Sequence, residues 1–232
     1  MNVRNYLFDF AVLFLVALSG MCFATPSTQI WNPSTDIQAK GSWHLGIDDY
    51  VTVDDRVSGG YSFPTDYGLT YGLLPGLEIG FDALFPQAVP GSSMVLNAKY
   101  GVPENGPLPS FAIGGYGFGL QSGVTDQNII YGVAARTFPL GRITAGYFAG
   151  NEKLLVDTAG VKDNAGLILT WDKMLTDRLW ACVDYAGTNS AVGAAFYGVS
   201  WLFAPNTSVI FGYGTYNNGA KPTVTTQLDI NL

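Results

Sequence analysis

Two polar side chains near the start of the chain have a spacing that could support hydrolysis. Ser42 and His44 lie two residues apart, so on a β-strand both would point to the same face. A serine activated by a histidine can act as a nucleophile toward a lipid ester. This face is the polar one, however, whereas a lipid hydrolase needs its nucleophile at the lipid interface, and no G-x-S-x-G motif is present. Lipid hydrolysis is therefore the weakest of three hypotheses, and we expect no catalytic residue.

Metal and cofactor chemistry has few residues to draw on. His44 is the only histidine, and the two cysteines are Cys22 and Cys182. Zinc and haem sites are built from clusters of such ligands. We therefore expect no metal site and no cofactor.

A larger set of polar residues recurs at every second position of apolar segments, and its seven acids outnumber its two fixed bases. Charges in a dry interior are costly unless they pair or meet water. With so few bases, the set favours a hydrated interior or carboxyl groups that hold a proton. The alternative is a hydrogen-bonded plug around Lys99 and Arg136. The predicted lumen-lining set is His44, Asp48, Asp66, Glu78, Asp82, Asn97, Lys99, Arg136, Asp172, Asp184, Gln227 and Asp229.

Composition indicates the kind of element that carries this set. The chain has 232 residues, of which 48% are hydrophobic and only 12% charged, about half the charged fraction of ordinary soluble domains. No segment after the leader has the 18 or more apolar residues of a spanning helix. Instead, residues 66–85 alternate between apolar and polar or glycyl positions on either side of Pro75-Gly76. Such alternation is typical of a hairpin with one face in lipid.

The same pattern predicts twelve strands, an even number as closure requires, although the long connection at 102–109 leaves ten or fourteen open. Short turns alternate with longer polar loops, as expected for periplasmic turns and external loops. The predicted strands are 41–53, 59–73, 77–86, 92–102, 109–119, 128–138, 142–150, 164–174, 178–188, 192–203, 207–216 and 223–232.

The predicted fold class is all-β: a closed antiparallel up-and-down transmembrane β-barrel over residues 41–232. Aromatic residues near strand ends predict girdles at the two membrane interfaces; a soluble β-sandwich with core aromatics is the alternative. Tyr50 belongs by its position to these strand-end aromatics. The girdle set is Trp43, Tyr67, Tyr71, Tyr100, Tyr147, Trp171, Tyr185, Trp201 and Tyr213.

Two segments precede the predicted barrel. Residues 1–24 have Arg4, an apolar core and Ala24 before the cut, which indicates a secretory signal peptide. Its removal would leave Cys182 as the only cysteine, so no intramolecular disulfide could form. Residues 25–40 are polar and show no period, and we expect them to form a periplasmic strap. Trp31 within it could dock a partner, or it could plug or brace the barrel mouth.

The last segment, TVTTQLDINL, resembles the C-terminal strand through which the barrel-assembly machinery recognises outer-membrane proteins. That pattern usually ends in Phe, so Leu232 is a departure. From leader to last strand, the chain resembles the small porin-like outer-membrane barrels of Gram-negative bacteria, and the segment TPSTQIWNPSTDIQ is similar to the mature start of members of this family.

The resemblance implies location in the bacterial cell outer membrane, with outer-membrane lipid as a partner. Our leading hypothesis is a narrow channel for small polar or cationic solutes. The alternative, from a different class, is a closed structural or partner-binding barrel without transport. The net charge of −7 and the 11 scattered Lys and Arg residues argue against nucleic acid as a partner.

Overall fold

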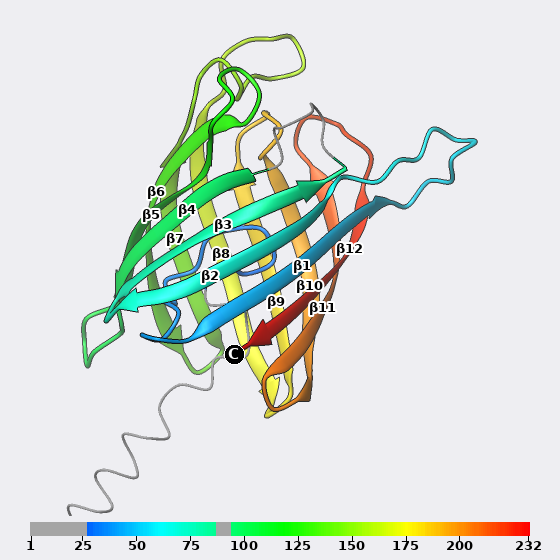
Figure 1. Ribbon diagram of the computed structural model, residues 1–232. Helices are drawn as coiled ribbons and strands as arrows, with labels where there is room; N and C mark the ends of the chain where they lie inside the picture. Colours follow the sequence, from blue (N-terminus) through cyan, green and yellow to red (C-terminus); the bar gives the residue numbers. More distant parts are fainter. Residues whose placement is uncertain (1–26, 87–93) are drawn as a thin grey trace, which may run out of the picture.

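The computed structural model describes residues 27–86 and 94–232, so the expected leader and the first two strap residues lie outside the described part. It is a closed antiparallel barrel, which confirms the predicted fold class (Figure 1). Within the described residues no helix is long and apolar enough to cross a membrane. The twelve described strands are β1 (Trp43–Thr52), β2 (Thr65–Leu74), β3 (Leu77–Phe85), β4 (Met94–Val102), β5 (Ser110–Gly119), β6 (Asp126–Phe138), β7 (Gly141–Ala149), β8 (Ala165–Thr176), β9 (Leu179–Gly187), β10 (Ala194–Ala204), β11 (Thr207–Tyr216) and β12 (Thr223–Asn231).

Each strand pairs with its neighbours in sequence, and the pairing of β1 with β12 closes the ring, from His44 opposite Asn231 to Thr52 opposite Thr223. An even number of antiparallel strands brings the start of β1 and the end of β12 to the same end of the barrel. Figure 1 shows this end with the short turns, and the longer loops at the opposite end. We call them the terminal end and the loop end.

Two predicted connections differ in detail. β2 begins at Thr65 rather than at residue 59, because Pro64 has no N–H to donate to a strand ladder. The long connection 103–109 does not change the strand count, because Asn105 and Leu108 pair with each other through both backbone bonds and fold it into a tight hairpin.

The wall has two faces with different side chains. Outward positions carry mostly large apolar residues, including Ile113 at 66% exposure and Ile130 at 59%. A continuous apolar exterior of this extent is not stable in water and indicates a surface that meets lipid or a partner. The inward positions of β1–β4 and β12 are mostly polar or glycine, whereas those of β5–β11 contribute to two apolar clusters and add the buried Asp172 and Asp184.

Residues 27–40, which we keep calling the strap, lie inside the barrel, whereas the sequence analysis expected a segment in the periplasm. Gln29, Ile30 and Asn32 are buried there, and Figure 1 shows the blue segment enclosed by the strands. The strap leaves at the terminal end, where Gly41 donates to the Gly72 carbonyl at 2.7 Å. Gly72 permits this crossing, since a Cβ there would lie 2.0 Å from the Ala39 carbonyl oxygen.

Candidate functional site

The barrel interior contains a cavity of about 500 Å³ between the strap and the inner face of β1–β5. Its lining reaches the loop end at Phe63, Thr125 and Val192, and the terminal half at His44 and Glu78. The strap forms one side of it through Ile30 and Trp31 and neighbouring residues. The cavity is therefore what remains of the lumen once the strap is in place.

Carboxyl groups from several strands gather on the wall of this cavity. Asp48 on β1 lies directly opposite Asp66 on β2, and Asp82 of β3 follows on the next strand. Glycines keep the space between them open: a Cβ at Gly68 would lie 3.0 Å from Asp82 Oδ1. Among the described residues, neither Asp48 nor Asp66 forms an ion pair, while Asp82 accepts a hydrogen bond of 2.9 Å from the Asn97 amide.

His44 and Asp229 form the neighbouring part of the polar wall. The His44 Nε2 atom lies 3.4 Å from Asp229 Oδ1, and its Nδ1 lies 3.1 Å from Asn231 Oδ1. Both side chains are almost fully buried. These contacts fix the imidazole within the barrel and do not pair it with a nucleophile.

The Ser42 hydroxyl is also committed to its surroundings. It donates to the Ala39 carbonyl at 2.7 Å and accepts a hydrogen bond from the Gln38 amide, also at 2.7 Å. The serine thus helps turn the strap into β1. The geometry gives no support to the Ser42 and His44 hydrolase hypothesis.

Glu78 and Lys99 hold both ends of the strap near the terminal end. The two side chains lie 3.3 Å apart and are nearly fully buried. Ser27 Oγ donates to Glu78 Oε1 at 2.7 Å, and the backbone N–H of Gln38 donates to Oε2 at 2.6 Å. Lys99 donates to the Ser27 carbonyl at 3.0 Å. One ion pair therefore fastens strap residues that are eleven positions apart.

Asp184 on β9 holds the middle of the strap. Its Oδ2 atom accepts hydrogen bonds from the backbone N–H groups of Ile30, Trp31 and Asn32 at 3.1, 2.9 and 3.2 Å. Three successive donors around one carboxylate oxygen form the concave anion site called a nest. The predicted lumen acid is thus occupied by the strap and does not line the cavity.

Arg142 is the inward arginine that the sequence analysis missed. Its guanidinium binds both oxygens of Asp36 at 2.8 Å and one of Asp172 at 2.9 Å. Asp172 also accepts from the Gln29 amide and from the indole of Trp180. This group fastens two further strap positions to β7 and β8.

The prediction that Arg136 lines the lumen is wrong. Arg136 pairs with Ile143 on the outward row, and its guanidinium lies 3.1 Å from Glu104 and donates to the Gly106 carbonyl at 2.6 Å. It stabilises the 103–109 hairpin at the terminal end. Thr137 is the neighbour on the inward row, opposite Arg142.

Trp31 is the aromatic centre of the strap. Its ring stacks on Phe196 with centroids 4.9 Å apart, and Tyr50 and Tyr216 meet it edge-on. Its indole N–H donates to the Val192 carbonyl at 2.9 Å. Tyr50, which the sequence analysis grouped with the strand-end aromatics, faces inward because it shares a row with His44 and Asp48.

The remaining candidates fall into simple groups. The girdle set lies on outward positions: Trp43, Tyr71, Tyr100, Trp171 and Trp201 toward the terminal end, and Tyr67, Tyr147, Tyr185 and Tyr213 toward the loop end. Gln227 is buried and donates to the Ile30 carbonyl at 2.9 Å. In residues 27–86 and 94–232, no group of three or more His, Cys, Asp or Glu residues is placed to hold a metal ion.

Neither a family model nor a curated protein sequence matches the chain. Several solved structures, however, have a similar fold. A KdgM porin has a TM-score of 0.55 at 10% identity, covering 81% of this chain and 98% of its own. An outer membrane channel from Pseudomonas putida F1 has a TM-score of 0.51 at 8% identity, covering 86% and 98%. A KdgM porin in complex with disordered oligogalacturonate has a TM-score of 0.52 at 10% identity. The chain thus has the fold of small outer-membrane porins.

Proposed function

We propose that this barrel is an outer-membrane channel for small cationic or polar solutes, with its termini in the periplasm and its long loops outside. The acidic cavity beside the strap is the observation that carries the proposal. The apolar exterior and the porin fold support the location. Small solutes would enter from the loop end, where the cavity lining includes loop residues.

The charge of the cavity favours cations. Asp48 and Asp66 lie directly opposite each other on the neighbouring strands β1 and β2. Two like charges in this position repel each other unless a positive charge balances them. Lys99, the base on the same wall, is already paired with Glu78. A hydrated cation would balance the free carboxylates, as rings of Asp and Glu do in cation channels. The oligogalacturonate named with one KdgM porin is an anion, so it does not indicate the solute of this cavity.

Passage also requires the strap to move. Strap residues bind Glu78, Asp172 and Asp184 and narrow the lumen toward the terminal end. We infer from this narrowing that the channel is closed with the strap in this position and conducts when the strap shifts.

The test is the conductance of the purified protein in planar bilayers under a KCl gradient. We expect brief openings with a reversal potential that shows cation preference, and loss of that preference in the double variant Asp66→Asn with Asp82→Asn. Glu152→Gln with Asp177→Asn removes the same formal charge outside the cavity and should leave selectivity unchanged. Anion preference or no preference in the wild type would overturn the cation assignment.

A closed scaffold is the second candidate, because the strap occupies so much of the interior. It would hold a periplasmic partner or brace the membrane without transport. A chain lacking residues 27–38 tests whether the strands alone enclose an open lumen, and a folded barrel that stays silent without this segment would exclude the channel. Openings of the full-length chain in bilayers would exclude the closed scaffold.

A further inference from the structure

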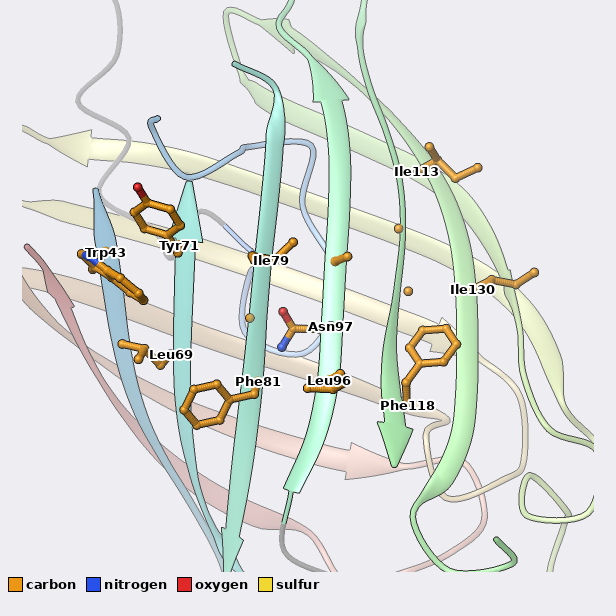
Figure 2. Close-up of a pocket in the computed structure, with 14 residues that line it drawn as sticks. Trp43, Leu69, Tyr71, Ile79, Phe81, Leu96, Asn97, Ile113, Phe118 and Ile130 are labelled. Carbon is orange, nitrogen blue, oxygen red and sulfur yellow. The ribbon is translucent and has the colours of Figure 1, made fainter. Parts of the chain in front are cut away.

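We propose that a groove on the outward face of β2–β6 binds an acyl chain of one phospholipid from the leaflet at the terminal end. The groove has a volume of about 850 Å³, within the range of about 300–1,000 Å³ that is usual for ligand pockets. Figure 2 shows its lining side chains on neighbouring strands. The proposal rests on the membrane placement proposed above, but not on conduction.

The shape of the groove follows from the strand register. One cross-strand row runs through Leu69, Phe81, Leu96 and Phe118, which stand side by side in Figure 2. The next row passes from Tyr71 and Ile79 to Ala98 and Gly115 before it reaches Ile130. Large residues therefore surround a low floor at Ala98, while the Phe118 ring covers Gly115, where a Cβ would lie 2.5 Å from that ring.

The side chains that line the groove favour a hydrocarbon ligand. Asn97 has the only polar amide or charged group among the lining side chains, and it is directed inward, where it donates to Asp82 at 2.9 Å. The Trp43 and Tyr71 rings bring the other polar atoms, at one edge of the groove. A ligand in the body of the groove would find no hydrogen-bond partner, so a polar ligand would be penalised there and a saturated chain would not.

The terminal end of the groove fits a phosphate headgroup. Trp43 and Tyr71 lie there with ring centroids 4.4 Å apart, and such rings mark the level of lipid headgroups. Lys40 lies at the same end of the groove, because its backbone pairs with Gly72, the residue that follows Tyr71. Lys40 is exposed and forms no salt bridge with any residue that the structure describes. A lysine beside an aromatic pair complements a phosphate whose chain enters the groove.

Native mass spectrometry of protein taken from palmitoyl-oleoyl phosphatidylglycerol nanodiscs tests the proposal. We expect one phosphatidylglycerol to stay bound at collision energies that remove the others. Ala98→Phe fills the floor from an exposed position and should reduce this retention at least tenfold. Ala145→Phe makes the same change at an exposed outward position of β7 outside the groove and should retain the lipid. Unchanged heat-dependent mobility on gels would show that both variants fold.

The headgroup contact has its own test. Lys40→Gln should lower retention of phosphatidylglycerol several-fold but leave retention of the diacylglycerol with the same chains unchanged.

Equal lipid retention by wild type and Ala98→Phe would overturn the proposed binding groove, as would a wild-type barrel that loses all its lipids at the same collision energy. A dimer that Ala98→Phe dissociates would assign the face to a second copy instead. A silent barrel that keeps its lipid would contradict the channel alone.

Discussion

Asp184 combines deep burial with three hydrogen bonds from a single stretch of backbone. Hydrogen bonds to a charged group contribute about 1.5–3 kcal/mol, and removal of the carboxylate leaves three strap N–H groups without their acceptor. We predict that Asp184→Ala increases the open probability in planar bilayers and speeds hydrogen exchange at residues 30–32. Thr144→Val is the control, because Thr144 is equally buried and its hydroxyl bonds to none of the described residues. An unchanged open probability together with slow exchange at 30–32 would show that the nest is dispensable.

Asp163 joins two loops at the loop end. Its carboxylate accepts hydrogen bonds from the Asn189 backbone at 2.7 Å and from the Asn189 amide at 3.0 Å. The backbone hydrogen bond from Asn189 is the main reason that the pKa of Asp163 lies below its ordinary value. A lowered pKa means that this contribution to loop stability is complete above the ordinary aspartate pKa and is lost as the pH falls through the lowered one.

The acid titration of the Asn189 amide signal by NMR measures this linkage. We predict a midpoint below the ordinary aspartate range in the wild type. Asp163→Asn should abolish the titration and make the 188–193 loop more sensitive to protease at pH 7. A midpoint at or above the ordinary value would mean that the bond is not formed in solution.

At the residue level, alternation was a good guide to inward positions on β1–β3 but not on β6. There the inward residues Ile129, Tyr131 and Val133 are themselves apolar, because they pack in a cluster against Phe148. Both faces of β6 carry apolar or small residues, so hydrophobicity does not distinguish its inward face from its outward face. The prediction therefore placed Arg136 on the wrong face. The sequence signal for Arg142 was weak, since it directly follows a turn.

The proposed opening of the channel depends on the position of the strap, and the native cysteine offers a way to lock this segment. The Cys182 thiol on β9 contacts the backbone of Ile30, and both residues belong to one buried cluster. We predict that Ile30→Cys forms a disulfide with Cys182 under mild oxidation, because the thiol contacts the backbone of residue 30 and the Ile30 side chain reaches Gly198, the residue paired with Cys182. The locked barrel should stay closed in bilayers and reopen on reduction.

Ile30→Ser is the matched control, because it changes the same side chain but cannot cross-link. Its conductance should not respond to oxidant or reductant. If the cross-linked protein conducts as freely as the reduced one, solutes pass the strap without displacing it.

The elements differ in how far sequence alone could place them. Strands were predictable because alternation is a local property that each segment displays by itself. The strap was not, because a polar segment without a period usually indicates exposure to water. A barrel interior reverses this rule: its polar wall, with Glu78, Asp172 and Asp184, provides the hydrogen-bond partners that water would otherwise supply.

At the scale of the whole molecule, the strap divides the interior into two parts. Toward β6–β10 it completes an apolar packing around Ile30 and Trp31. Toward β1–β4 it leaves the acidic cavity open to solvent. The packed part stabilises the strap inside the barrel, and in the proposed channel the cavity is the path that strap movement would extend.

The apolar exterior makes a prediction about the barrel as a whole in its bilayer. Val199 lies in the middle of β10 and faces outward, while Phe203 faces outward near the terminal end of the same strand. A positive charge on the lipid face costs about 2–4 kcal/mol at the midplane and about 0–1 kcal/mol near an interface. We therefore predict that Val199→Arg lowers the free energy of unfolding by about 2–4 kcal/mol, and Phe203→Arg by about 1 kcal/mol or less.

Urea titration of the barrel in phosphatidylcholine vesicles, followed by tryptophan fluorescence and by gel mobility, measures both values. The comparison within one strand matters, because both variants replace an outward apolar side chain with the same charge at different depths. Equal costs at the two positions would mean that the exterior does not cross a hydrocarbon layer at this depth. The membrane placement would then fail, and with it the reason for expecting lipid in the groove.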